Sequence, residues 1–260
     1  MNTVRPVSAA LRQLLPLLLV LALGACSVQQ TRLTPGSIVD ASEPVQRDTT
    51  IALLGGTGFV GGYLLREALS RGYPVRLLSR SPDNLAYLGE RVTVINGDAR
   101  DPGALQALLD GAQVVVSALG PPRARGDSRS GLNSAVTAAL IPAMQAAGIE
   151  RYLLISGAAV VMPGDARNLS GWWMRQLVRV RYPGILEDRQ REYDLLAVSD
   201  LGWTLLRCPL IEGEGYQAPA RVTLDTPAGF YLRAGELAQF LLDELETPRF
   251  RRQGPFLSSP

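Results

Sequence analysis

The sequence predicts a single α/β domain with a mostly parallel, doubly wound sheet, preceded by an export leader and a flexible tether. Three observations carry this prediction. Residues 50–68 read as a strand, a glycine-rich turn and a helix, and strand-like and helix-like segments alternate after them. A short leucine-rich segment lies near the N-terminus. With 260 residues, 47% of them hydrophobic, the chain is long enough for one domain with a sizeable core.

The glycine-rich turn is the most informative part of the chain. Ile51 to Leu54 form a short apolar run of the kind that buried parallel strands show, and GGTGFVG follows directly. In a nucleotide-binding βαβ unit Gly55 makes the tight turn, Gly58 lets backbone amides approach a pyrophosphate, and Gly61 packs the helix closely on the sheet. A plain tight turn is the alternative, but the second strand at the expected distance favours a dinucleotide site. The predicted cofactor residues here are Gly55, Thr57, Gly58, Phe59, Val60 and Gly61.

Further elements follow from apolar runs and helical periodicity. The expected strands are Thr50–Leu54, Pro74–Leu78, Val92–Ile95, Val114–Ala118, Tyr152–Ser156 and Trp203–Arg207. The expected helices are Val60–Ser70, Pro102–Leu109, Leu132–Ala147, Gly184–Val198 and Ala234–Leu245. Asp101 is the expected N-cap of the second helix, with Pro102 at its first position.

Several motifs together resemble one family. They are GGTGFVG, GDARD at 97–101, SALG at 117–120, GIERYLLISGA at 148–158, LGWTLLRCPLI at 201–211 and the ending RAGELAQFLLDELETPRFRRQGPF. The chain from residue 50 onward resembles the atypical short-chain dehydrogenases/reductases, in the NAD(P)-binding group with NmrA-like proteins and the flavin/biliverdin reductase type. The resemblance implies a Rossmann-like domain, with Asp98 near the adenine and Ala118, Leu119 and Gly120 beside the nicotinamide ribose. Turn chemistry alone also explains these residues.

Arg80 bears on the choice of cofactor. Domains that prefer NAD usually carry an acidic residue after the second strand, whereas an arginine suits the 2′-phosphate of NADP. Ser79-Arg80 stands there in this chain, so NADP is favoured, with NAD possible. The alternative is a solvated surface arginine.

Catalytic residues depart from the family pattern. Its typical members pair Tyr with Lys four residues on, and this chain contains no Lys and no His. Tyr182 is followed four residues later by Leu186, and the other possible alignment places Gly184 and Asp188 at the two positions. Ser156 occupies the place of the usual serine partner, where its hydroxyl either orients a substrate or bonds the local backbone. Ser156 and Tyr182 are therefore the candidate catalytic residues.

Three functions are compatible with these observations. The first is an NADPH-dependent reductase of a small aromatic, flavin or quinone acceptor, in which the cofactor carries the chemistry and water supplies the proton. The second is a non-catalytic nucleotide-binding sensor or interaction module of the cell envelope, which export favours. The third, a nucleotide-sugar epimerase or dehydratase, is weakened by the missing Tyr–Lys pair. The substrate and the oligomeric state are left open.

The N-terminus has the features of a bacterial lipoprotein leader. Arg5 and Arg12 precede the short apolar stretch Leu14–Leu23, and the sequence LGAC ends at Cys26. This predicts a signal peptide over 1–25, lipidated Cys26 with a flexible linker over 26–49, and the domain over 50–260. Ser27, rather than Asp, follows Cys26, and this resembles lipoproteins that are sorted to the outer membrane. The domain would then face the periplasm. A plain signal peptide or an uncleaved anchor is the alternative.

Charge and cysteine content narrow the partners. Without the leader the chain has 24 arginines against 24 acidic residues, so no basic field predicts nucleic-acid binding. With Cys26 acylated, Cys208 has no cysteine partner and is expected in the core. No metal site is expected.

Residues 168–182, NLSGWWMRQLVRVRY, form an unusual segment in which Trp172, Trp173 and Met174 stand among arginines. Three interpretations are open. The segment is a substrate lid, an interfacial membrane anchor, or a helix that packs its aromatic side chains on the sheet edge.

Overall fold

A computed structural model describes residues 46–120 and 131–260 of the protein. Its main sheet has eight strands in the order β3-β2-β1-β4-β5-β6-β10-β8, all parallel except β8. A second, two-stranded parallel sheet pairs β7 with β9. The strands are β1 (Ile51–Leu54), β2 (Val75–Ser79), β3 (Val92–Asn96), β4 (Val114–Ser117), β5 (Arg151–Gly157), β6 (Gly202–Cys208), β7 (Leu210–Glu212), β8 (Arg221–Thr223), β9 (Tyr231–Arg233) and β10 (Phe256–Ser258).

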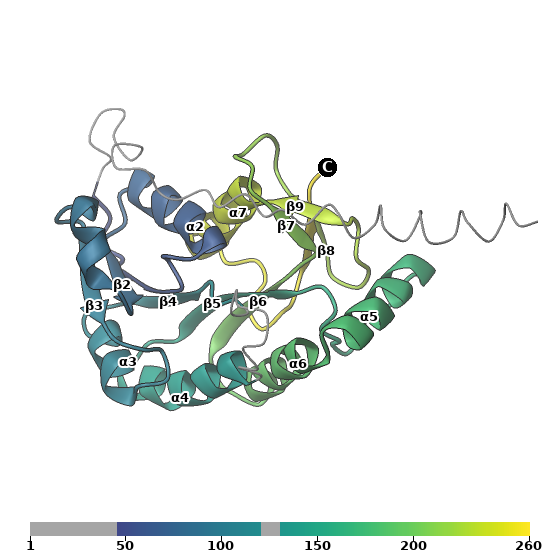
Figure 1. The fold of residues 1–260 in the computed structure, drawn as a ribbon, viewed down its shortest axis with the longest axis horizontal. Helices are drawn as coiled ribbons and strands as arrows, with labels where there is room; N and C mark the ends of the chain where they lie inside the picture. The colour runs from purple at the N-terminus through teal and green to yellow at the C-terminus, as the bar shows by residue number, and fades with distance from the viewer. Residues whose placement is uncertain (1–45, 121–130) are drawn as a thin grey trace, which may run out of the picture. The chain divides into compact units, whose positions relative to one another are not determined.

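Helices cover both faces of the sheet. Figure 1 shows α2 and α7 on one face and α3, α4 and α6 on the other. The helices are α2 (Phe59–Ser70), α3 (Pro102–Leu109), α4 (Leu132–Ala146), α5 (Leu169–Arg181), α6 (Pro183–Ala197) and α7 (Ala234–Glu246), and a 3-10 helix, η1, spans Pro82–Leu88. The predicted doubly wound α/β fold is confirmed.

The strand pleat divides the core into two layers. In β1, Ile51 and Leu53 join the apolar cluster beneath α2 and α7, whereas Ala52 and Leu54 join the cluster beneath α3, α4 and α6. This alternation explains why the central strands are continuously apolar, since both of their faces are buried.

The six expected strands and five expected helices are present, with ends that differ by at most one residue. Asp101 caps α3, and its side chain accepts a hydrogen bond from the backbone N–H of Gly103. Cys208 is buried, as expected. The sequence prediction lacked η1 and the four three-residue strands β7 to β10, and it included a helix over residues 168–182 only as one of three interpretations.

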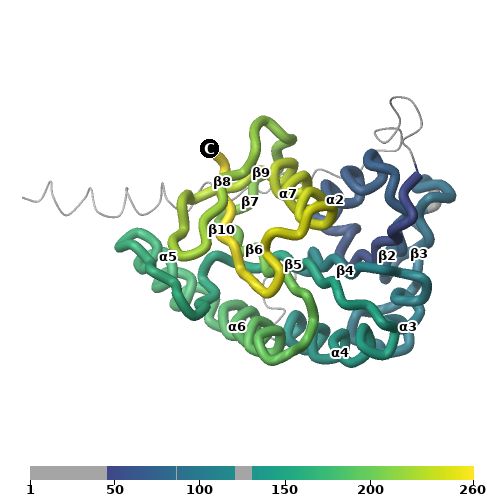
Figure 2. The backbone as a smooth tube through the Cα atoms, turned by 180° about the vertical axis from the view of Figure 1, so that it is seen from behind, coloured from purple at the N-terminus to yellow at the C-terminus, as the bar shows by residue number. Residues whose placement is uncertain are grey.

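α5 corrects one interpretation of residues 168–182. Trp172 and Trp173 do not pack on the sheet edge, because 46% and 63% of their surfaces are exposed. Figure 2 shows α5 beyond the end of the layer that α3, α4 and α6 form. Among the described residues, no helix is long and apolar enough to cross a bilayer. Cys26 and the leader lie outside the described residues.

Candidate functional site

The strand order places the predicted cofactor residues at the carboxyl ends of the central strands, which form the ligand edge of the sheet. β1 lies between β2 and β4, and β5 follows β4, so the chain leaves the parallel strands β1, β4 and β5 side by side. The direction of strand order reverses between β1 and β4, because β2 and β3 lie on one side and β5 and β6 on the other. Ligands of open α/β sheets bind in the crevice outside such a switch point.

The glycine-rich turn is built around two close backbone approaches. Gly55 has φ +75°, and a Cβ there would lie 2.7 Å from the carbonyl oxygen of Ala118. A Cβ at Gly61 would overlap the carbonyl oxygen of Gly55. Gly58 is the N-cap of α2 and donates its N–H to Gly55 O at 2.8 Å, and no side chain caps the helix. The first amides of α2 are therefore left for an anion, and the turn fits a pyrophosphate.

The other predicted residues of the turn lie at the N-terminus of α2. Phe59 and Val60 begin α2, and Thr57 is exposed directly before its N-cap. Their backbone groups belong to the turn that would surround the phosphates. Contact with the cofactor stays a prediction for all of them.

Arg80 follows β2, the strand beside β1. Its side chain is exposed and makes no hydrogen bond or ion pair within residues 46–120 and 131–260. The guanidinium interacts electrostatically with Asp98, but it forms no hydrogen bond with the described residues, so its donors fit a phosphate group of the ligand.

Asp98 has a local partner. Its carboxylate accepts hydrogen bonds from the guanidinium and the backbone N–H of Arg100, each at 2.9 Å. These bonds hold the pKa of Asp98 well below its ordinary value. Asp98 therefore fixes the turn after β3, and its place near the adenine stays a prediction.

The loop after β4 is tied to α6. Ala118 donates its N–H to Leu54 O at 2.9 Å, and Leu119 O accepts a hydrogen bond from the buried guanidinium of Arg189. Gly120 is exposed, and a Cβ there would meet no atom of the described residues within 4 Å. Arg189 thus positions the segment predicted to border the nicotinamide ribose.

Arg189 belongs to a buried polar cluster that the sequence prediction did not include. Its guanidinium pairs with Glu192 at 2.8 Å, and Thr137 Oγ1 lies 3.3 Å from both Glu192 and the hydroxyl of Tyr152. Burial raises the pKa of Glu192, although the Arg189 charge opposes this. In the sequence, an Arg–Glu pair three residues apart is indistinguishable from a surface pair on a helix.

Ser156, in β5, has the most unusual environment among the candidate catalytic residues. Its side chain is buried, and its hydroxyl oxygen has no hydrogen-bond partner among the described residues. Local backbone bonding, one interpretation of this serine, is therefore wrong. A buried polar atom without a partner at the ligand edge of the sheet fits a group that arrives with substrate or cofactor.

Tyr182 and Asp188 do not complete a catalytic pair with Ser156. Tyr182 is half-exposed at the junction of α5 and α6, and the Arg181 guanidinium lies 4.8 Å from its ring centroid. The carboxylate of Asp188 accepts four hydrogen bonds from Asn133 and Ser134 at the start of α4. Asp188 is thus a helix cap, and Tyr182 is not bonded to Ser156.

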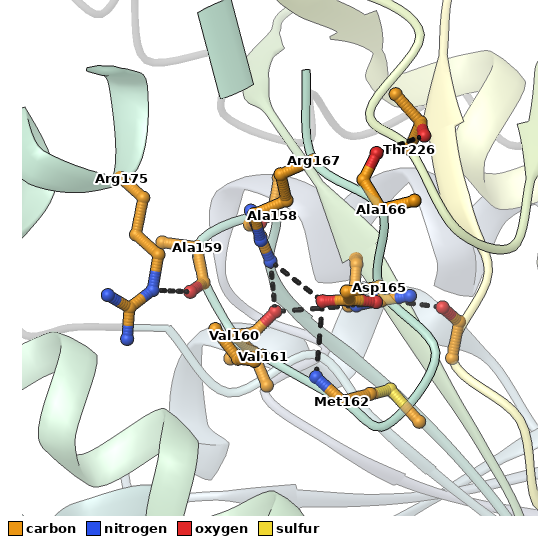
Figure 3. A network of polar contacts seen from close by, with 12 residues as sticks. Ala158, Ala159, Val160, Val161, Met162, Asp165, Ala166, Arg167, Arg175 and Thr226 are labelled. Carbon is orange, nitrogen blue, oxygen red and sulfur yellow. Dashed lines mark hydrogen bonds and ion pairs between the residues drawn. The ribbon is translucent and has the colours of Figure 1, made fainter. Parts of the chain in front are cut away.

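A polar network fixes the loop that follows Ser156 (Figure 3). Arg207 in β6 is 1% exposed and pairs with Asp165 at 2.6 Å. Arg167 donates to Ala158 O at 2.8 Å and to Asp165 at 3.2 Å, and Arg175 of α5 donates to Ala159 O at 3.1 Å. The segment between β5 and α5 is therefore a defined structure beside the candidate site.

Comparison with known proteins identifies the class. A family model described as NAD(P)H-binding matches residues 55–248. The chain belongs to this NAD(P)H-binding family, and its fold is that of the atypical short-chain dehydrogenases/reductases. The expected nicotinamide cofactor, NADP or NAD, is confirmed at the level of the family. The first curated relatives are 30–35% identical over 117–134 residues, and the chain spans about a third of their length.

Solved structures match most of the chain. A protein from Burkholderia pseudomallei that is provisionally described as exported is 27% identical. Its TM-score is 0.64 over 81% of this chain and 100% of that one. An anaerobilin reductase from Escherichia coli O157:H7 is 20% identical, with a TM-score of 0.68 over 82% and 98%. A short-chain dehydrogenase/reductase from Veillonella parvula in complex with NADP is 19% identical, with a TM-score of 0.66 over 82% and 95%.

Proposed function

We propose that the protein is an NADPH-dependent reductase of a small aromatic, flavin or quinone acceptor that works without a Tyr–Lys pair. The buried, unpartnered hydroxyl of Ser156 at the ligand edge of the sheet carries this proposal. Membership of the NAD(P)H-binding family supports it, as does the likeness in fold to an enzyme titled as a reductase.

The residues present fit the cofactor. The amides at the start of α2 would bind the pyrophosphate, and the exposed guanidinium of Arg80 would bind a 2′-phosphate. The Arg189 bond to Leu119 O would keep the loop after β4 in place beside the ribose. When bound, the reduced nicotinamide supplies a hydride.

The chain's own residues would orient the acceptor and leave the proton to solvent. Ser156 can donate one hydrogen bond to a carbonyl-type oxygen, which gains negative charge as the acceptor is reduced. With no Lys or His in the chain, no ammonium or imidazole near the site can act as the acid. A flavin or quinone suits such a site, because its reduced oxygen or nitrogen can take a proton from water.

A non-catalytic envelope module is the second candidate. The observation that favours it is the position of Tyr182, half-exposed and not bonded to Ser156. NADPH binding without turnover of flavins, quinones or aldehydes would select this alternative.

For location we propose a lipid anchor at Cys26 in the outer membrane, facing the periplasm. The LGAC sequence supports this, as does the likeness to a protein titled as exported. Mass spectrometry of the wild type should find acyl groups on Cys26, and Cys26→Ser should accumulate as an unprocessed precursor. Wild-type protein without lipid contradicts the anchor.

Calorimetry of NADPH and NADH binding tests the cofactor site. Arg80→Ala is expected to weaken NADPH by about tenfold to a hundredfold and NADH little, because a charge-assisted hydrogen bond contributes about 1.5–3 kcal/mol. Arg221→Ala, which removes another exposed arginine, is the control and should change neither affinity. Gly58→Val should abolish binding, with circular dichroism to show that the variant is folded. Unchanged NADPH affinity in folded Gly58→Val would overturn the site.

Turnover of Ser156→Ala tests the role of the hydroxyl. Removing a buried polar atom that has no partner leaves stability unchanged or higher. A fall in kcat of about tenfold or more would then report lost orientation in the reaction. Tyr182→Phe is the comparison and should change kcat by less than about tenfold. A large loss at Tyr182 with none at Ser156 would contradict the mechanism.

A further inference from the structure

α5 presents its apolar side chains to solvent. Four of them, spaced four, four and three residues apart, lie on one stripe of the helix. Their exposed fractions are 72% for Leu169, 63% for Trp173, 62% for Leu177 and 80% for Val180. Gly171 is the only residue of α5 that is buried. A helix on a globular domain normally buries such a stripe and exposes its polar side.

The exposed apolar surface of the described residues is concentrated here. Eight of the fifteen large hydrophobic side chains that are exposed lie between positions 169 and 185. Monomeric soluble proteins rarely leave an apolar patch of this kind uncovered, and those that do use it for a protein partner or a membrane.

The charge of α5 favours one of these occupants. The helix contains Arg175, Arg179 and Arg181 and no acidic residue. Arg179 and Arg181, both exposed, lie on opposite borders of the apolar stripe. Long arginine side chains at the borders of an apolar face, together with tryptophans, are typical of helices that lie in the headgroup region of a bilayer. The positive charge complements anionic lipid.

α5 is also hydrogen-bonded to the loop that follows β5. Asn168 caps it by accepting a hydrogen bond from Gly171 N at 2.8 Å, and Arg175 donates to Ala159 O in the network of Figure 3. The stripe therefore lies on a capped helix that is bonded to the network beside the candidate site. Under the proposed lipidation of Cys26, a flexible linker of about 20 residues would have an r.m.s. end-to-end distance of about 25 Å and would keep the domain close to a bilayer.

We propose that the α5 stripe docks on an anionic phospholipid surface, with the helix lying in the plane of the headgroups. The docking is independent of the reductase proposal, because it uses none of the residues assigned to the cofactor or to Ser156.

The tryptophans make the test direct. Two of the three lie on α5, and the third, Trp203, is buried in β6. The full-length protein is incorporated in vesicles of phosphatidylcholine, with or without phosphatidylglycerol, whose acyl chains are brominated to quench nearby tryptophans. The expected result is a loss of about half of the emission or more in anionic vesicles, much less in neutral ones, and a decrease of the effect with salt.

Variants separate the stripe from the rest of the chain. Leu177→Asp/Val180→Asp should abolish quenching in a folded protein, because both side chains are exposed. Trp172→Phe/Trp173→Phe should leave only the unquenched signal of Trp203. Arg179→Gln/Arg181→Gln should weaken the docking equilibrium constant on anionic vesicles by about fivefold per arginine, measured as the ratio of quenched to unquenched protein. Arg191→Gln/Arg221→Gln removes the same charge elsewhere on the surface and should have no effect.

Three outcomes would overturn the proposal. The first is no quenching by anionic brominated vesicles. The second is concentration-dependent self-association that Leu177→Asp disrupts, in the absence of lipid quenching, which would make the stripe an interface with a second copy. The third is a change in α5 tryptophan emission on adding NADPH and an acceptor but not lipid, which would make α5 a cover of the site.

Discussion

α5 and α6 are consecutive helices with opposite relations to the domain. α6 buries Asp188, Arg189 and Glu192, whereas α5 exposes its tryptophans and aliphatic side chains. The difference shows that the polarity of a side chain does not by itself decide whether that side chain is buried. What decides it is whether the fold offers a partner for the group.

The charges of α6 are buried because each has such a partner. Asp188 caps α4, and Arg189 is bonded both to Glu192 and to Leu119 O. The apolar stripe of α5 has no partner among the described residues. Disturbing the two helices should therefore have very different effects on stability.

The largest effect is expected for Arg189→Met, which leaves Glu192 buried without its counter-charge. Loss of one member of a buried pair costs about 3–5 kcal/mol in the free energy of unfolding. Urea denaturation measures this, with Arg191→Met as the matched control. Arg191 lies 3.5 Å from Glu187 in an exposed pair, so its loss should cost less than about 1 kcal/mol. Equal losses in the two variants would contradict the buried-pair assignment.

The same variant has a pH signature. Burial raises the pKa of Glu192, so without Arg189 the neutral carboxyl is favoured in the folded protein. A raised pKa in the folded state favours folding at low pH and disfavours it as pH rises. The stability gap between Arg189→Met and Arg191→Met should therefore narrow as pH falls. If the stability gap between the two variants widens as pH falls, ionisation of the buried Glu192 is not the cause of the gap.

An intermediate effect is expected for Asp188→Asn. Burial opposes ionisation of Asp188, but hydrogen bonds from Ser134 and Asn133 outweigh it and lower the pKa. Because its pKa is lowered in the folded state, ionised Asp188 contributes fully to the free energy of unfolding above the unfolded pKa of about 3.9. This contribution is lost as pH falls through the pKa of the folded state. The substitution should cost about 1–3 kcal/mol at neutral pH and progressively less in acid.

Asp194→Asn is the control for this prediction, since Asp194 is exposed on the same helix. Thermal or urea unfolding at several pH values measures both variants. A difference between them that does not depend on pH would show that the charge of Asp188 is not what caps α4.

The smallest effect is expected on α5. Leu177→Ala should change the free energy of unfolding by less than about 0.5 kcal/mol, because its side chain is already in water. Leu196→Ala, at a fully buried position of α6, should cost about 2–5 kcal/mol. A large loss at Leu177 would mean that the stripe is packed against the domain in solution, and this would remove the basis for docking.

The glycine-rich turn and most of the secondary structure were predictable from the sequence. The turn after β1 has glycines where a positive φ or a close backbone approach requires them, as at Gly55 and Gly61. Six strands and five helices follow from local apolar periodicity, which depends only on which side chains must face the core. Arg80 and Ser156 were located as strand-end residues because strand ends follow from the same patterns. The glycine-rich turn in this part of the chain also predicts a dinucleotide site.

Only the tertiary structure decided how the last strands join the sheet and which charged side chains of the C-terminal half are buried. β10 has three residues and pairs with β6 through Phe256 and Arg207, a contact between positions far apart in the chain. Arg207 is buried because Asp165 and the carbonyl oxygen of Gly254 meet its guanidinium, and no local pattern reveals such partners. The exposed stripe of α5 and the buried charges of α6 have the same origin. Helical periodicity shows that a face is apolar or charged, but what covers that face is decided by segments that the chain brings to it from a distance.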